Sequence, residues 1–193
     1  MTRRRFEMDT VISAARELLR DTPGIRFIRA GDGDELPGYR AQAQDCGNVI
    51  FPGWLNAAQI QELLARAHLG LVPYRNTPDL VISVPNKVGE YLAAGVPVAT
   101  CLEGTLARLL SRRRCGVSFE ASNPASFANM LRQLRADEPQ RRTLSANARL
   151  AYREELAAET VYRRLIERLE QIAAQAREPQ RARINADRVD QRT

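Results

Sequence analysis

The chain is poor in the residues that build metal sites and aromatic binding platforms. Its 193 residues include three cysteines and one histidine, and aromatic residues make up 6% of the sequence. Cys46, Cys101 and Cys115 lie far apart in a pattern that does not match metal-ligand spacing, and His68 adds only one further soft ligand. We therefore expect no metal. The low aromatic content also argues against a stacking platform for single-stranded nucleic acid.

Long hydrophobic runs are lacking as well. No apolar stretch approaches the roughly 20 residues that cross a bilayer. The basic start of the chain is followed by Glu7 and Asp9, which interrupt the apolar core that a signal peptide needs. These features predict a cytoplasmic protein.

The net charge of +6 suggests an anionic partner, either nucleic acid or a membrane surface. Arginines alternate with aspartates and glutamates along most of the chain, so no continuous basic groove is visible. We therefore expect no nucleic-acid binding. Peripheral contact with an anionic membrane remains an alternative.

Short apolar runs rich in β-branched residues alternate with helical patterns. The first helical pattern begins at Met8 and ends before Pro23-Gly24, and Asn56 with Gln59 resembles a capping box for a later helix. This alternation predicts an α/β fold, a Rossmann-like parallel sheet with helices on both faces. The predicted strands are 25–30, 49–51, 69–73, 96–100 and 116–119.

No further strand is predicted after Asp137. Two helices are predicted there, the second with apolar residues from Val161 to Ala173, whereas residues 178–193 have almost no apolar content. We therefore expect one folded domain over residues 1–177, followed by a mobile basic tail over 178–193.

Lys87 is the single lysine among 29 lysines and arginines. Pro85 fits the first position of a helix, so the free amides of Asn86 and Lys87 would lie at the ligand-binding edge of the sheet. A cation is unfavourable at a helix N-terminus unless an anion, such as a diphosphate, binds there too. Glu90, one turn later, could accept hydrogen bonds from sugar hydroxyls. A Lys87–Glu90 pair on a solvated helix face is the alternative, and the spacing does not separate the two.

Gly31-Asp32-Gly33 follows the first predicted strand. Two glycines allow the backbone to approach a ligand closely, but the third glycine of the dinucleotide fingerprint is lacking. An ordinary turn between strand and helix explains the segment equally well.

Three sequence blocks resemble one family. They are Val49-x-Phe51-x-Gly53, then Ala65 to Pro73, then Pro85-x-Lys87-x-x-Glu90-Tyr91-x-Ala93-x-Gly95-x-Pro97-Val98. Their order and spacing are similar to those of the C-terminal, donor-binding half of GT-B type glycosyltransferases (group 1, family 4-like), which act on nucleotide sugars. The resemblance extends over residues 7–174.

The resemblance implies roles for particular residues. The segment of Ser83, Val84, Pro85, Asn86 and Lys87 would hold the donor diphosphate, and Glu90 would bind the ribose. Lys87 and Glu90 are thus the expected catalytic residues. The remaining expected binding residues are Gly31 and Gly33, with Gly53 and Trp54 near the nucleobase. Trp54 could stack on the base, or it could cap the core.

Two departures from the family limit this transfer. Many retaining members have a further glutamate at the position of Ile82. Such a domain also usually begins with a strand and a glycine-containing turn before its first helix, whereas this chain begins almost directly at that helix. The acceptor-binding domain that normally precedes it is not part of the sequence. We therefore expect a donor-binding half that binds a nucleoside-diphosphate sugar and transfers to an acceptor held by a separate domain. The alternative is a non-catalytic nucleotide-binding or interaction subunit, a remnant or split-enzyme partner, whose exposed sheet edge another chain could cover.

Overall fold

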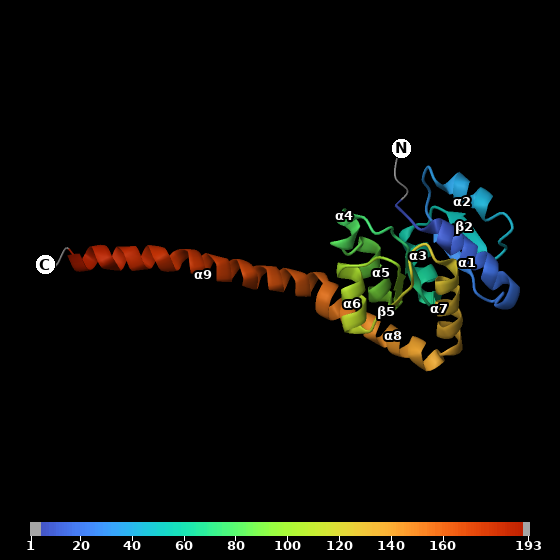
Figure 1. The fold of residues 1–193 in the computed structure, drawn as a ribbon. Coiled ribbons are helices and arrows are strands. Elements are labelled where there is room, and N and C mark those ends of the chain that lie inside the picture. The colour runs from blue at the N-terminus through green and yellow to red at the C-terminus, as the bar shows by residue number, and fades with distance from the viewer. Residues whose placement is uncertain (1–4, 191–193) are drawn as a thin grey trace. The chain divides into compact units, whose positions relative to one another are not determined.

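The structure, a computed structural model, describes residues 5–190. Its contacts divide the chain into two compact units, Met1–Tyr152 and Arg153–Thr193. The first unit carries the α/β fold (Figure 1), and the second consists mainly of the helix α9 (Ala158–Asp190). The predicted domain boundary at residue 177 remains a prediction.

The predicted tail lies partly in α9. The backbone of residues 178–190 is helical, whereas residues 191–193 lie outside the described part of the chain. The mobility that we expect for this segment stays a prediction.

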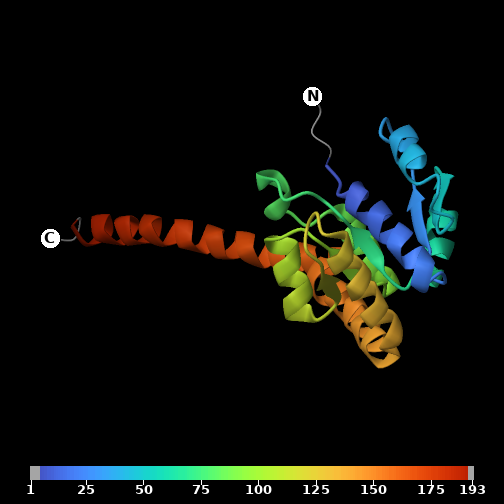
Figure 2. The same cartoon turned by 45° about the vertical axis from the view of Figure 1, so that its right-hand side comes forward.

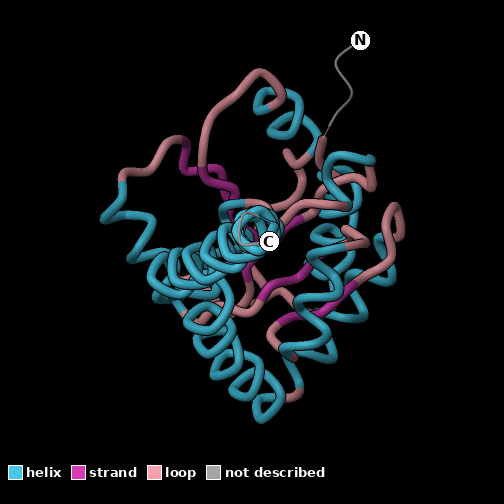
Figure 3. Tube along the Cα trace, turned by 90° about the vertical axis from the view of Figure 1, so that its left-hand side faces the viewer, coloured by secondary structure: helices cyan, strands magenta, loops and turns pink. Residues whose placement is uncertain are grey.

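All the strand pairings of the described ladders are parallel, which confirms the Rossmann-like class. Figure 3 shows these strands in magenta among the helices. Instead of one sheet, the strands form a two-stranded sheet of order β1-β2 and a three-stranded sheet of order β3-β4-β5. Phe27 pairs with Val49 in the first sheet, and Leu71 with Ala99 in the second. The strands are β1 (Phe27–Ala30), β2 (Val49–Gly53), β3 (Gly70–Val72), β4 (Val98–Thr100) and β5 (Gly116–Ser118).

The helices of the first unit follow the predicted alternation. The capping box at α3 is confirmed, because Asn56 Oδ1 accepts from the Gln59 amide at 2.9 Å and Gln59 Oε1 accepts from the Asn56 amide at 2.9 Å. The helices are α1 (Met8–Asp21), α2 (Leu36–Gln42), α3 (Ala57–Arg66), α4 (Pro78–Val81), α5 (Asn86–Ala94), α6 (Thr105–Arg113), α7 (Pro124–Ala136) and α8 (Glu138–Ala151).

Helices cover both faces of the three-stranded sheet. α1 and α7 pack against each other (Figure 2), and the buried Phe127 of α7 lies 4.3 Å from Phe119, ring centre to ring centre. Ala99 belongs to this core, so its neighbours Val98 and Thr100 point to the opposite face. On that side α5 lies against β3 and β4, with α8 behind it.

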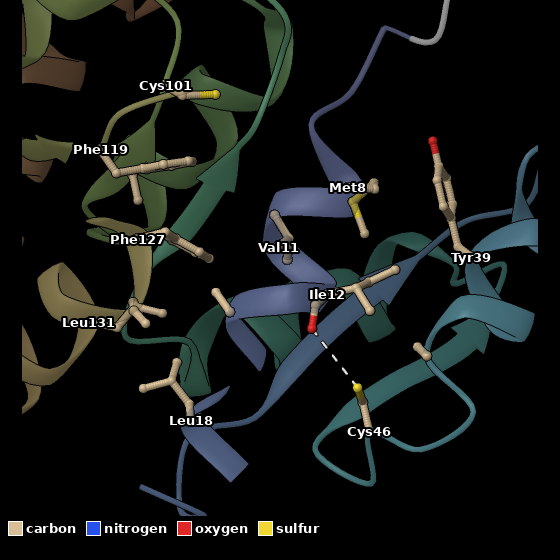
Figure 4. Close-up of a cluster of buried hydrophobic side chains, with 14 residues drawn as sticks. Met8, Val11, Ile12, Leu18, Tyr39, Cys46, Cys101, Phe119, Phe127 and Leu131 are labelled. Carbon is tan, nitrogen blue, oxygen red and sulfur yellow. Dashed lines mark hydrogen bonds between the residues drawn. The ribbon is translucent and has the colours of Figure 1, made fainter. Parts of the chain in front are cut away.

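α1 connects the two sheets. On one side its Ala15 carbonyl accepts from the Asn48 side chain at 2.8 Å, and its Ile12 carbonyl accepts a weak hydrogen bond from the Cys46 thiol (Figure 4). On the other side Glu17 pairs with Arg132 of α7 at 2.9 Å. α1 therefore joins the β1-β2 sheet to the rest of the core.

Candidate functional site

The carboxyl end of β3 and the start of α5 meet at Lys87. Its Nζ lies 5.0 Å from the ring centre of Tyr74, two residues after β3, and 5.2 Å from that of Phe6. The two rings are stacked, with centres 4.7 Å apart. Both contacts fall within cation–π range.

The ammonium group of Lys87 is half-buried. Burial lowers its pKa, the positive charge of Arg29 lowers it further, and the negative charge of Glu90 acts in the opposite direction. Among the described residues Lys87 forms no hydrogen bond and no ion pair, and Glu90 is exposed. The alternative of a Lys87–Glu90 pair on a solvated face is therefore not found.

The first turn of α5 presents free backbone donors. The helix begins at Asn86. Pro85 is therefore its N-cap, and not the first helical residue that we predicted. Pro85 has no side-chain acceptor to satisfy the amides, which leaves the positive end of the helix dipole open. Val84 is half-buried, and Ser83 donates its hydroxyl to the Leu80 carbonyl at 3.0 Å, so that hydroxyl is engaged within the loop.

The glycines after β1 and at the end of β2 come together. The Gly31 amide donates to the Gly53 carbonyl at 2.7 Å, and Gly31, Gly33 and Gly53 all have positive φ angles. No atom lies within 4 Å of the Cβ position at Gly31 or Gly33, so the backbone there is accessible. Trp54 is 70% exposed, which overturns the alternative that it caps the core.

Arg29 contacts one of these glycines and acts electrostatically on Lys87, and its role was not predicted from the sequence. Its Nη1 donates to the Gly31 carbonyl at 2.8 Å, its guanidinium lies 5.6 Å from the Tyr39 ring centre, and its charge acts on Lys87. The sequence signal that could have identified Arg29 was its charge inside the apolar run of β1. The edge thus carries two cations, the amides of α5 and open glycine backbone.

Two further acids, Glu7 and Asp79, are engaged in hydrogen bonds, whereas Glu90 stays exposed. Glu7, 5% exposed, accepts hydrogen bonds from Thr10 at 3.1 Å and Ser122 at 3.3 Å, and Arg75 lies 3.6 Å away. These contacts of Glu7 were not predicted from the sequence. Asp79 accepts from Arg5 and Thr77.

Ile82 stands where many retaining family members have a glutamate. It is 76% exposed, on the short segment between α4 and α5. The side chain at this position therefore offers no polar contact to a donor sugar.

Several solved structures share the fold. A sucrose-phosphate synthase from Thermosynechococcus elongatus matches with a TM-score of 0.71 at 19% identity, over 88% of this chain and 43% of that one. The HepE protein of Anabaena, solved in complex with UDP, matches with a TM-score of 0.68 at 20% identity, over 84% and 44%. The C-terminal domain of a group 1 glycosyl transferase, LpcC from Francisella tularensis, matches with a TM-score of 0.61 at 17% identity, over 76% and 77%.

These matches identify the fold as one half of a GT-B fold. The chain spans less than half the length of the first two structures, and no curated protein matches it. Within the described residues no helix is long and apolar enough to cross a membrane. The sequence family described as glycosyl transferases group 1 matches residues 1–137, and the chain belongs to this family.

Proposed function

We propose that the first unit binds the diphosphate of a nucleoside-diphosphate sugar and serves as the donor-binding half of a glycosyltransferase. The observation that carries this proposal is Lys87. Its half-buried ammonium forms no ion pair among the described residues, although it stands at the amide-rich start of α5 and feels the positive charge of Arg29. A diphosphate would neutralise both cations and satisfy the free amides.

The same groups would assist the departure of the nucleotide. When the bond between the sugar and the diphosphate breaks, negative charge accumulates on the diphosphate oxygens. Lys87, Arg29 and the α5 amides are already oriented before the reaction, so they stabilise that charge with little rearrangement. Lys87 is the catalytic residue because it stabilises the charge on the departing diphosphate.

Glu90 and the glycine turns complete the proposed donor site. Glu90 is exposed one helical turn after Lys87, where its carboxylate can accept hydrogen bonds from ribose hydroxyls. The accessible backbone at Gly31 and Gly33 leaves room for the nucleoside, and the exposed Trp54 ring can stack on its base. The UDP in the HepE structure supports a nucleotide ligand for this fold.

Transfer of the sugar also requires a binding site for the acceptor. The chain spans 43% of the synthase and 44% of HepE. We therefore propose that a further domain or polypeptide binds the acceptor. The alternative function, a nucleotide-binding subunit without transfer activity, would show the same donor binding without turnover when that partner is supplied.

Thermal unfolding with UDP, GDP, ADP and their sugar conjugates tests the donor site. A ligand at about one hundred times its Kd stabilises the folded state by about 2.7 kcal/mol, which raises Tm by several degrees. We expect a shift for one diphosphate, lost in Lys87→Ala and reduced in Glu90→Ala. Arg142→Ala, which removes an exposed arginine paired with Glu138 on α8, is the matched control and should keep the shift. A folded chain without any shift would refute the proposal.

A further inference from the structure

The rings of Phe6 and Tyr74 form a stacked pair beside Lys87. Their centres lie 4.7 Å apart with an angle of 26° between the ring planes, and the Lys87 Nζ lies 5.2 Å from the centre of Phe6 and 5.0 Å from that of Tyr74. A cation within about 6 Å of a ring centre is attracted by the electron-rich face of the ring. The ammonium is almost equally distant from the two ring centres, so both rings contribute to the contact.

Backbone pairing sets the position of this ring pair. Phe6 and Tyr74 are opposite each other in an antiparallel bridge. The hydrogen bonds lie on either side of them, at 2.7 Å from the Glu7 amide to the Pro73 carbonyl and at 2.9 Å from the Arg75 amide to the Arg5 carbonyl. Opposite residues that exchange no hydrogen bond themselves have the closer side chains in an antiparallel pair. The backbone therefore brings the two rings together independently of Lys87.

Further contacts fix the two segments that carry the rings. The buried Glu7 carboxylate accepts hydrogen bonds from Thr10 of α1 and from Ser122, which follows β5. The Tyr74 carbonyl accepts a weak hydrogen bond, at 3.4 Å, from the thiol of Cys101, which follows β4. The ring pair is thus tied to α1, β4 and β5, and it offers a fixed surface to the side chain that contacts it.

The ammonium of Lys87 depends on this surface because it has few other contacts. Within the described part of the chain it forms no hydrogen bond and no ion pair. Burial and the charge of Arg29 favour the neutral amine, whereas the charge of Glu90 favours the ammonium. The ring faces act in the same direction as Glu90, because they attract the cation and not the neutral amine. The ring pair therefore restricts the movement of Lys87 and opposes the loss of its charge.

Packing of the N-terminal segment is the alternative role for the rings. Phe6 is half-buried and packs against the main hydrophobic core. An aliphatic side chain could fill that space, but it has no electron-rich face to attract Lys87. Replacement of each ring by leucine therefore separates the two roles.

We propose that Phe6 and Tyr74 are positioning residues of the donor site, whose rings hold the Lys87 ammonium charged and in place beside the first turn of α5. The rings act on the diphosphate only through Lys87. A lysine that is already held in place loses less side-chain freedom when it binds the diphosphate. This inference rests on the proposed function, because it adds two residues to the same site.

Titration calorimetry of the full chain with UDP, GDP and ADP tests the proposal. Phe6→Leu and Tyr74→Leu each remove one ring, and each should weaken binding of the diphosphate that the parent chain prefers by about two- to tenfold. Tyr74→Phe keeps the ring and should keep the parent affinity. Phe27→Leu is the matched control, because Phe27 is also half-buried but lies at the amino end of β1. It should bind the diphosphate as the parent does.

A second measurement reports on Lys87 itself. Because the chain contains one lysine, lysine labelled with carbon-13 at Cε gives a single signal in the NMR spectrum, and its pH titration yields the Lys87 pKa. We expect this pKa to fall by about half a unit in Phe6→Leu and in Tyr74→Leu, and to change little in Tyr74→Phe and Phe27→Leu. Rings that only pack the N-terminal segment would affect stability without this change.

The outcomes distinguish this inference from the proposed function. A folded parent chain that binds none of the three diphosphates would refute the proposed function, and the role of the rings with it. If the parent chain binds one of them, unchanged affinity in a folded Phe6→Leu or Tyr74→Leu variant would overturn the role of that ring alone. Weaker binding without the fall in the Lys87 pKa, or an equal loss in Phe27→Leu, would also overturn it.

Discussion

The ammonium of Lys87 lies 5.0 Å from the ring centre of Tyr74, so the single lysine of the chain is held over an aromatic surface rather than beside a carboxylate. The aromatic contacts stabilise the cation only in part, because burial and Arg29 both lower the Lys87 pKa. The site therefore carries a positive charge that a bound anion would stabilise.

This arrangement predicts a pH dependence of diphosphate binding. A bound diphosphate favours the protonated lysine, so affinity should fall as pH rises through the Lys87 pKa, which lies below its ordinary value of 10.5. Titration calorimetry with the preferred nucleotide between pH 7.5 and 10.5 measures the loss. Lys87→Arg is the control, since a guanidinium stays charged throughout this range. Equal pH dependence in both proteins would contradict the role of Lys87.

Gly116 packs closely against a neighbouring strand, which predicts a large effect of a single methyl group. A Cβ at this position would overlap the Val98 carbonyl oxygen and lie 3.0 Å from the Leu110 methyl groups. Because the obstacle is backbone, Gly116→Ala should lower the free energy of unfolding by about 1–3 kcal/mol. Urea denaturation measures the difference.

Gly38 provides the control for Gly116. It lies in α2, and no atom is within 4 Å of its Cβ position. Gly38→Ala should leave stability unchanged or raise it by up to about 1 kcal/mol, because alanine favours the helix. Similar losses in both variants would show that Gly116 is not packed as described.

Local sequence signals predicted individual elements well. The helix expected from Met8 to before Pro23 spans Met8–Asp21, and the capping box of Asn56 and Gln59 forms both of its hydrogen bonds. α2 was missed because it contains Pro37 and Gly38, which are typical of turns. These successes and failures depend on residues that are neighbours in the sequence.

Contacts between distant residues could not be predicted in the same way. The division into two sheets depends on which strands pair across the fold, and no local pattern encodes this. Arg29 and Lys87 are far apart in sequence, and the electrostatic effect of one on the other follows from where β1 ends and α5 begins. The family resemblance placed Lys87, whereas Arg29 lay inside an apolar run that periodicity assigned to a strand.

Phe127 occupies the centre of the core that α1 and α7 form. It is 1% exposed and contacts Phe119 and Phe27, with ring centres 4.3 and 6.2 Å away. Phe127→Ala removes these contacts and leaves a cavity, so the free energy of unfolding should fall by about 3–5 kcal/mol. Ile82→Ala, at a site 76% exposed, should change it by less than about 0.5 kcal/mol. Chemical denaturation of both variants gives the comparison.

Two buried thiols predict a loss of stability at alkaline pH. Burial raises the pKa of Cys115 to about 11 and that of Cys101 to about 12. In the unfolded chain the thiols ionise at their ordinary value near 9. Above that pH the unfolded state therefore holds fewer protons than the folded state, and the free energy of unfolding falls as pH rises toward 11. Lys87 contributes in the opposite direction, because its pKa is lowered in the fold.

Urea denaturation at several pH values between 8 and 10.5 tests this prediction. Cys115→Ala removes one thiol, so its stability should decline less steeply with pH than that of the parent chain. Lys87→Met removes the opposing contribution and should make the decline steeper. In the folded protein at pH 8 Cys115 should react slowly with a thiol reagent, because it is fully buried and protonated. A Cys115→Ala variant with the same slope as the parent would show that this thiol ionises equally in both states.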